Sequence, residues 1–289
     1  MSLISNIGFK PLKEKPITVN KDIISKDISI VIPVKNNQMG INKFLTTFFE
    51  VTKEIYYPKE IIIVDNNSQP QISINNDYPI NIKLLTCSKI GPASARNKGI
   101  DEAQGKWILF LDSDCIPTEN SISSYLRNNN TYIAYAGNIQ ALSNNKLSQY
   151  YISQEILIPP EAIDNDIKRP DYLITANCLV DKEALKIING FDENFYQAGG
   201  EDIDMAFRLL SIGEIQYQFD SIVLHDFNDG IIGFIKRFIR YGRGNKQLEI
   251  KHNLKLKPKL FLPIQLSSLN TILALLQYIS MYIGYKRYQ

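Results

Sequence analysis

The stretch Trp107–Pro117, with the sequence WILFLDSDCIP, decides the fold. Its first five residues are apolar and end abruptly at Asp112-Ser113-Asp114. A short apolar run with polar ends is typical of a strand buried on both faces of a parallel sheet. Open α/β sheets bind their ligands at the carboxyl ends of such strands. Two acids spaced i, i+2 on an extended chain point the same way, so both can face one cation or the sugar and phosphate that it holds. An isolated D-x-D also fits a solvated loop, so other residues must support the site.

The composition suits one large globular domain, alone or with an appendage. The chain has 289 residues, of which 44% are hydrophobic and 21% are charged. Cys87, Cys115 and Cys178 lack C-x-x-C spacing, which argues against a disulfide framework or a structural zinc site and favours a reducing compartment. Residues 1–27 hold no apolar core of signal-peptide length. We therefore expect a cytoplasmic location.

Strands and helices are predicted to alternate along most of the chain. Apolar runs and apolar residues at helical spacing predict strands at 28–34, 60–64, 82–86, 107–111, 132–140, 172–180, 215–219 and 221–224, and helices at 41–51, 93–103, 182–188 and from about 201 to 210. Such alternation with short turns indicates βαβ units, and hence an α/β fold with a mostly parallel sheet flanked by helices. We expect an irregular lead-in at 1–27 and a polar, irregular insert at 141–171.

Polar residues gather where several predicted strands end. Asp65 follows the second strand, the D-x-D follows the Trp107 strand, and His225 ends the last one. Glu201 and Asp202 begin a predicted helix after two glycines, which permit close backbone approach. These residues form four candidate sites.

Together these sites resemble those of the family 2 glycosyltransferases of the GT-A fold. Seven stretches carry the resemblance, in the family's order: ISIVIPVKN, IIIVDNNS, GPASARNKGI, WILFLDSDCIP, GFDENF, GGEDIDMAFRL and VLHDF. The resemblance covers residues 28–227 and implies a GT-A domain at 28–230, between the lead-in at 1–27 and a helical C-terminal segment at 231–289. It is specific because seven weak motifs must coincide.

The resemblance implies an inverting, metal-dependent transfer of a sugar from a nucleotide-diphosphate sugar, UDP-linked by expectation, to a saccharide or lipid-linked acceptor. Asp202 would be the catalytic base, with Glu201 and Gly200 at the acceptor. Asp114 and His225 would bind Mn²⁺ or Mg²⁺. The donor would be bound by Pro33, Val34, Asn36, Asp65, Arg96, Asp112 and Ser113. Nucleic acid is not an expected partner.

The chemistry explains why such residues are needed. Expulsion of a diphosphate places negative charge on the leaving oxygen, which a divalent cation stabilises as a Lewis acid. Carboxylates suit Mg²⁺ or Mn²⁺, and an imidazole ligand shifts the preference toward Mn²⁺. Structural alternatives remain: His225 could be a packed histidine, Arg96 a salt-bridge partner, and Glu201 and Asp202 helix-capping acids. Asp192 and Asp204 are assigned to that capping class alone.

Rival functions make different demands on the sequence. A sugar-nucleotide pyrophosphorylase needs a glycine- and arginine-rich loop after the first strand, where this chain reads PVKNNQMG. A processive synthase needs several membrane-spanning helices and a Q-x-x-R-W motif, but Trp107 is the only tryptophan. A catalytically inactive sugar-nucleotide-binding module would not need both the DSD and the ED sites.

The C-terminal segment differs from the rest in charge. Residues 231–289 hold eleven Lys and Arg against the single acid Glu249, whereas residues 1–230 hold 21 basic and 29 acidic residues. The spacing predicts a basic amphipathic helix at 231–242, followed by an uncharged stretch at 260–285. We expect this segment to lie in or on the cytoplasmic face of a membrane, with a helix packed against the domain or another subunit as the alternative.

Overall fold

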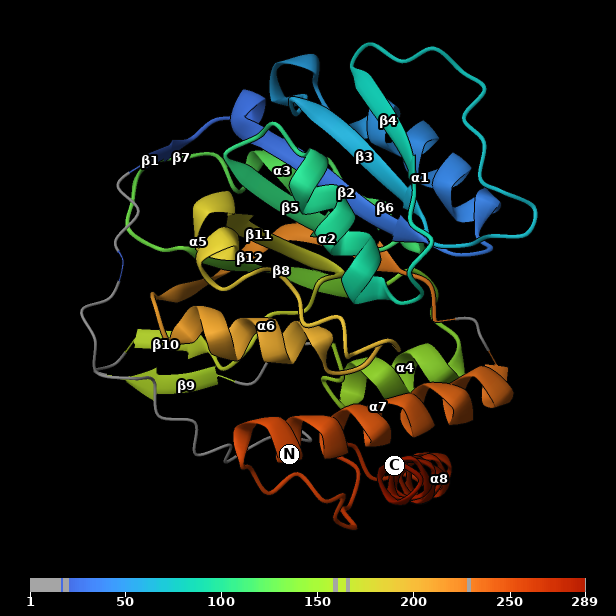
Figure 1. The fold of residues 1–289 in the computed structure, drawn as a ribbon. Coiled ribbons are helices and arrows are strands. Elements are labelled where there is room, and N and C mark those ends of the chain that lie inside the picture. Colours follow the sequence, from blue (N-terminus) through green and yellow to red (C-terminus); the bar gives the residue numbers. More distant parts are fainter. Residues whose placement is uncertain (1–16, 18–20, 158–160, 165–166, 228–229, 289) are drawn as a thin grey trace.

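The central sheet has eight strands and is flanked by helices (Figure 1). In this computed structural model the described residues are 17, 21–157, 161–164, 167–227 and 230–288. The strands of the sheet are β2 (Ile28–Val34), β3 (Glu60–Asp65), β4 (Asn81–Thr86), β5 (Trp107–Leu111), β6 (Cys115–Pro117), β8 (Ala134–Ala141), β11 (Asn177–Asp181) and β12 (Ile215–His225). Their order across the sheet is β4-β3-β2-β5-β11-β8-β12-β6.

The sheet has a parallel half and a mixed half. Strands β4, β3, β2 and β5 run parallel, and every side chain of β5 is buried, as its apolar sequence predicts. Strand β11 then runs antiparallel to both β5 and β8, β12 runs parallel to β8, and β6 runs antiparallel to β12. The α/β class and the helix-flanked sheet are therefore confirmed.

The helices are α1 (Gln38–Val51), α2 (Pro92–Glu102), α3 (Asn120–Ser123), α4 (Lys146–Ser153), α5 (Lys182–Ile187), α6 (Glu201–Leu210), α7 (Gly230–His252) and α8 (Ser268–Lys286), with 3-10 turns at Ser25–Asp27 and Glu54–Tyr56. Helix α1 buries the apolar positions that its spacing predicts, Ile41, Phe44 and Phe48 among them. The Asp181 side chain caps α5 by accepting a hydrogen bond from the Ala184 amide.

Two strand predictions differ from the structure. The stretch predicted as a strand at 172–180 is a strand only from Asn177 onward. The side-chain amide of Asn177 donates to the carbonyls of Asn138 and Ser221 and so fixes the start of β11. The two short strands predicted at 215–219 and 221–224 form one strand, β12, with a register shift against β8 between Gln218 and Ile222.

Both segments predicted to be irregular contain regular elements. In the described part of the lead-in, β1 (Lys21–Ile23) pairs with β7 (Arg127–Asn130) because the Ile23 side chain is buried in the core. The insert at 141–171 contains α4, capped by Asn145, and the hairpin of β9 (Glu161–Asp164) and β10 (Ile167–Pro170). The rest of these predictions, at 1–16, 18–20, 158–160 and 165–166, lies outside the described residues.

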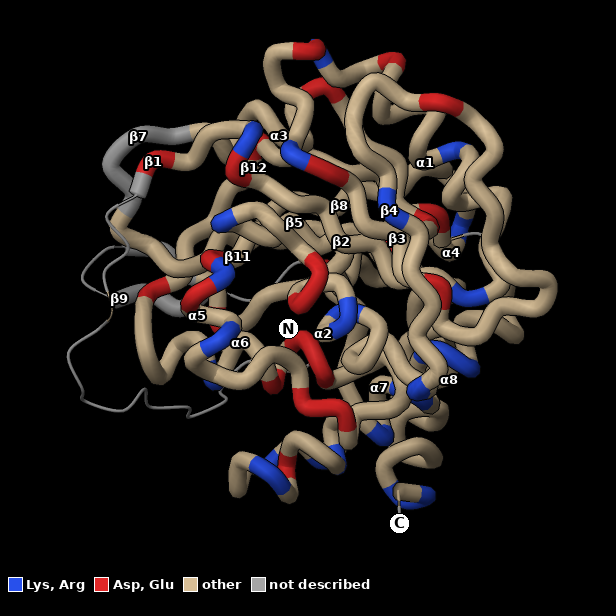
Figure 2. The backbone as a smooth tube through the Cα atoms, turned by 45° about the horizontal axis from the view of Figure 1, so that its top comes forward, with Lys and Arg blue, Asp and Glu red and all other residues tan. Residues whose placement is uncertain are grey.

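Helices α7 and α8 pack side by side below the sheet (Figure 1). A Cβ on Gly242 would come within 2.0 Å of the Met281 carbonyl, and one on Gly284 within 1.9 Å of the Ile239 carbonyl, so the two backbones touch. Buried aromatic residues of α4 and α7, together with Leu273, Ala274 and Met281 of α8, form a second core. Figure 2 shows Lys and Arg on α7, whereas α8 carries a basic residue only at its end, Lys286. No helix among the described residues is both long and apolar enough to cross a bilayer.

Candidate active site

The end of β5 and the end of β12 meet at the D-x-D. Strand β6 begins directly after Asp114 and pairs with β12 in a register that sets Cys115 opposite His225. The pairing brings Nε2 of His225 to 3.5 Å from Oδ2 of Asp114, although 111 positions separate the two residues in the chain. The sequence therefore predicted correctly that these two polar strand ends lie together.

The geometry of His225 suits a metal ligand. Its Nδ1 lies 3.0 Å from the Asp226 carbonyl, so the tautomer that donates there keeps the Nε2 lone pair facing Asp114. The ring stacks on Phe227, which fixes its plane. The Cys115 sulfur lies within 4.8 Å of the ligand atoms of Asp114 and His225. Burial raises the pKa of the Cys115 thiol well above its ordinary value, so the carboxylate and the imidazole are the available donors. This oxygen and nitrogen set fits Mn²⁺ or Mg²⁺.

Arg96 links the D-x-D to helix α6. Its guanidinium is buried and lies 2.8 Å from Oδ1 of Asp112 and 3.0 Å from Oε1 of Glu201. Arg96 stands in the second turn of α2, which begins at Pro92. The salt-bridge alternative for Arg96 is therefore present in the structure.

Helix α6 begins with two acids, Glu201 and Asp202, that have different surroundings. Gly199 and Gly200 have φ values of +123° and +131°, and Gly244 of α7 packs so closely on the Gly199 carbonyl that no Cβ would fit. Glu201 accepts hydrogen bonds from Arg96 and from the Gly199 amide, so both of its oxygens are engaged. Burial, and then the charge of Glu201, raise the pKa of Asp202 to about 7 despite the opposing charge of Arg96. Asp202 can therefore accept a proton near neutral pH.

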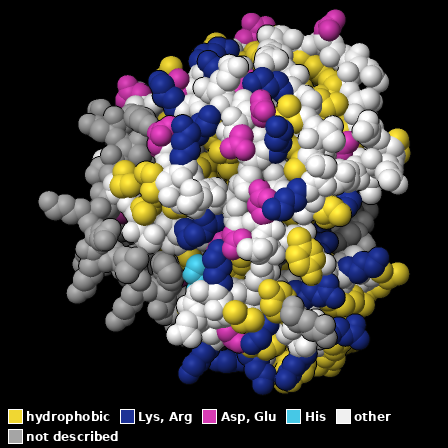
Figure 3. All heavy atoms as spheres, in the orientation of Figure 1, with side chains coloured by type: hydrophobic (Ala, Val, Ile, Leu, Met, Phe, Trp, Pro, Cys, Tyr) yellow, Lys and Arg dark blue, Asp and Glu magenta, His cyan; other side chains and the backbone are white. Residues whose placement is uncertain are grey.

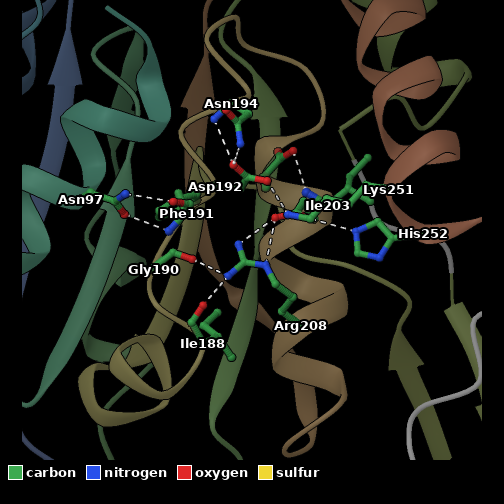
Figure 4. A network of polar contacts seen from close by, with 12 residues as sticks. Asn97, Ile188, Gly190, Phe191, Asp192, Asn194, Ile203, Arg208, Lys251 and His252 are labelled. Carbon is green, nitrogen blue, oxygen red and sulfur yellow. Dashed lines mark hydrogen bonds and ion pairs between the residues drawn. The ribbon is translucent and has the colours of Figure 1, made fainter. Parts of the chain in front are cut away.

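Two residues further along α6, Asp204 is the centre of a buried ion network. Its partners Arg208, Lys251 and His252 are labelled in Figure 4. Its carboxylate lies 2.7 Å from Arg208, 2.7 Å from Lys251 and 2.8 Å from His252, and its side chain is fully buried. These contacts join α6 to the end of α7. Asp204 stands in the first turn of α6, as its predicted capping role requires, and its carboxylate also binds three cationic side chains.

The same network holds the loop that precedes α6. Arg208 donates to the carbonyls of Ile188 and Gly190, and Asn97 of α2 exchanges two hydrogen bonds with the Phe191 backbone (Figure 4). Asp192 accepts from Lys251 and from Asn194, so it too binds a partner from α7. The loop and α6 are thus fixed between α2 and α7.

A cavity of about 860 Å³ unites most of the predicted site. Ten of the twelve predicted site residues line it: Pro33, Val34, Arg96, Asp112, Ser113, Asp114, Gly200, Glu201, Asp202 and His225. Helix α7 contributes part of the remaining wall, including Arg237, Arg240 and Arg243, and the rest comes mainly from residues 154–157, 174–176 and 196–199. No α7 residue was among the predicted site residues, because the basic spacing of 231–243 does not reveal which surface the helix contacts.

Asp65 and Asn36 do not line the cavity. The Asp65 carboxylate is buried and accepts hydrogen bonds from the amides of Ser68 and Ile72. Burial raises its pKa, but these bonds more than offset burial, so the pKa of Asp65 lies below its ordinary value. Asn36 accepts from the Gln69 amide. In this structure both residues hold the loop at 66–72, which borders the cavity at Asn66.

The fold and the paired acidic sites define a glycosyltransferase-like protein, and the comparisons agree. The family model described as "Glycosyl transferase family 2" matches residues 29–186, so the chain belongs to this family. A second model, "N-terminal domain of galactosyltransferase", matches residues 168–221.

Among its relatives, a "Pre-mycofactocin glycosyltransferase" of Mycobacterium tuberculosis is 28% identical over 245 residues, which cover 81% of this chain and 50% of that protein. The chain thus spans about half the length of this curated relative. A mannosyltransferase from Pyrobaculum calidifontis, solved with GDP-Man and Mn²⁺, has a TM-score of 0.56 at 13% identity and covers 95% of this chain and 77% of its own. GalNAc-T7, solved with UDP, GalNAc and Mn²⁺, has a TM-score of 0.54 at 15% identity, over 69% of this chain and 43% of its own. These structures share the GT-A fold with this chain.

Proposed function

We propose that this protein transfers a sugar from a nucleotide-diphosphate sugar to a hydroxyl group of a saccharide or lipid-linked acceptor, in the synthesis of a glycan. One observation carries the proposal: Asp114 with His225 and the proton acceptor Asp202 line the same cavity. A group that can hold a cation and a group that can accept a proton are the two requirements of such a transfer.

In this proposal Asp114 and His225 hold Mn²⁺ or Mg²⁺, which would stabilise the negative charge of the departing diphosphate. The hydrogen bond from Nδ1 to the Asp226 carbonyl orients the imidazole for that role. Support comes from the oxygen and nitrogen donor set and from the Mn²⁺ with which two structures of the same fold were solved.

Asp202 is the proposed base. It takes the proton from the acceptor hydroxyl while that oxygen attacks the anomeric carbon from the side opposite the leaving group, which inverts the configuration. Its raised pKa of about 7 suits a base at neutral pH. Glu201 and Gly200 border the acceptor in this arrangement. Arg96 sets the positions of Asp112 and Glu201 through its two ion pairs.

Pro33, Val34, Asp112 and Ser113 form the proposed donor side, since they line the cavity around the end of β5. Asp65 and Asn36 act there through the loop that they hold. The nucleotide is proposed as UDP; the two structures of the same fold were solved with UDP and with GDP-Man. The three cysteines are free and buried, which fits the reducing cytoplasm as the proposed location.

The test is a melting-temperature screen of UDP- and GDP-sugars with and without Mn²⁺. A bound donor stabilises the folded chain by about 2.7 kcal/mol at a hundredfold excess over Kd. The correct nucleotide sugar should therefore raise the melting temperature more than the others do. Asp114→Asn and His225→Ala should each abolish the part of this stabilisation that needs Mn²⁺. The control is Asp101→Asn, an exposed acid on the outside of α2, which should respond as the wild type does. Metal-dependent stabilisation that survives in both site variants would contradict the proposal.

A further inference from the structure

Helix α8 has two apolar faces, and only one of them is packed. Leu273, Ala274, Gln277 and Met281 face α7 and are buried. On the other side, Ile272, Leu275 and Ile279 recur at helical spacing and are 63%, 50% and 43% exposed. A surface helix normally presents polar residues to water on its outer face. The outer face of α8 therefore lacks the polar character that contact with water alone would favour.

The chain before α8 extends the same surface. Leu260, Leu262, Ile264 and Leu266 lie on the irregular segment before α8, and each side chain is exposed, while Pro263 between them is buried. We call these four residues, together with Leu269, Ile272, Leu275 and Ile279 of α8, the α8 outer surface. In Figure 3 hydrophobic and basic side chains gather at the lower edge of the molecule, where Figure 1 places α8.

The charges around this surface all have one sign. Lys255, Lys257 and Lys259 precede it and Lys286 and Arg287 follow it, and the sequence has no acid after Glu249. A second copy of the chain docked on this surface would bring these cations together without a neutralising acid. An anionic lipid headgroup layer would supply both the negative charge and an apolar interior for the aliphatic side chains.

We infer that the α8 outer surface docks on an anionic bilayer, with α8 lying in the interface plane. Met281, on the opposite side of α8, lines the active-site cavity. Because a helix with its side chains is about 10 Å across, docking would bring the cavity wall within that distance of the membrane. If the protein transfers sugar as proposed above, its acceptor would be lipid-anchored.

The test uses the full-length chain and vesicles of phosphatidylcholine, with or without about a quarter phosphatidylglycerol. Sedimentation should carry the protein down with the anionic vesicles, less at about 1 M salt than at about 0.1 M. Ile272→Gln/Leu275→Gln/Ile279→Gln should weaken partition about tenfold or more, because three inserted aliphatic side chains are lost. Lys255→Gln/Lys257→Gln/Lys259→Gln should weaken it about tenfold or more and reduce its salt dependence.

The matched control replaces three exposed hydrophobic residues elsewhere, Met39→Gln/Ile55→Gln/Ile187→Gln, and should bind vesicles as the wild type does. If the α8 variant does not fold, Leu262→Gln/Leu266→Gln on the segment before α8 serves instead. The inference is overturned if the wild type does not bind anionic vesicles, or if the control loses as much binding as the α8 variant. It is also overturned if light scattering shows a dimer that the α8 substitutions dissociate. Vesicle binding needs no donor or acceptor, so this result is independent of the test of sugar transfer.

Discussion

Asp202 and Asp204 stand two residues apart on α6 and have opposite electrostatic surroundings. Asp202 lines the cavity, and burial followed by the charge of Glu201 raises its pKa to about 7, although the charge of Arg96 opposes them. Burial also raises the pKa of Asp204, but its contacts with His252, Arg208 and Lys251 more than offset burial, and the pKa lies below its ordinary value. The comparison teaches that the surroundings, and not the residue type, separate a proton acceptor from a structural anchor: burial beside Glu201 raises one pKa, and three cationic partners lower the other.

The largest expected effect is on Asp202. Asp202→Asn keeps the shape of the side chain but removes the proton acceptor, so transfer should fall by about 10²–10⁴-fold. Donor affinity should not change, because the residue acts on the acceptor. Rates of sugar transfer and donor titrations measure the two effects separately. Transfer at nearly the wild-type rate would remove Asp202 from the mechanism.

The matching change at Asp204 should affect stability. Asp204→Asn leaves Arg208, Lys251 and His252 around an uncharged group, and loss of one partner of a buried ion pair costs about 3 kcal/mol. Urea unfolding at neutral pH gives the difference from wild type. The comparison would fail if Asp204→Asn unfolded with the wild-type free energy, or if Asp202→Asn lost as much stability.

The effects of the two acids should be lost in different pH ranges as the pH falls. The rate of transfer needs ionised Asp202, so it should fall about tenfold for each pH unit below 7. Asp204 has a folded pKa below its ordinary value of 3.8, so its stabilisation is complete above that value and is lost as pH falls through the folded pKa. A pH–rate profile tests the first statement. The Asp202→Asn variant is the control, because its rate should not show this fall below pH 7. Unfolding of the Asp204→Asn variant along the same pH range tests the second.

The smallest expected effect is at the rim of the ion network. Asp192 is partly exposed and lies 2.6 Å from Lys251, which also contacts Asp204. Asp192→Asn should cost less than about 1 kcal/mol, because water screens an exposed ion pair. Urea unfolding measures it beside Asp204→Asn. A loss equal to that of Asp204→Asn would mean that burial does not distinguish the centre of the network from its rim.

Local patterns were sufficient to predict much of the fold and the site. Strand β5 was predictable because a parallel strand buried on both faces must be apolar throughout, and its end located Asp112 and Asp114. His225 was predictable because it ends an apolar run at the same edge of the sheet. The family motifs supplied Glu201 and Asp202, whose roles remain predictions.

The missed features depend on contacts between distant segments. Asp204 has the i, i+4 partner Arg208 in the sequence, but Lys251 and His252 come from a helix more than forty residues away. The α7 wall of the cavity was missed for the same reason, because a basic amphipathic pattern does not reveal which surface the helix contacts. The division of the chain into a lead-in at 1–27, a GT-A domain at 28–230 and a C-terminal segment at 231–289 stays a prediction.

The glycines of α7 have a consequence for how this protein can vary in evolution. Gly242 touches the Met281 carbonyl of α8, and Gly244, two residues later, touches the Gly199 carbonyl before α6. A helix that meets backbone on two sides cannot accept a larger residue at one contact by moving toward the other. Positions 242 and 244 should therefore remain glycine, even in related proteins in which the neighbouring arginines change with the substrate. Such proteins should also keep a glycine at 284, where a Cβ would strike the Ile239 carbonyl of α7.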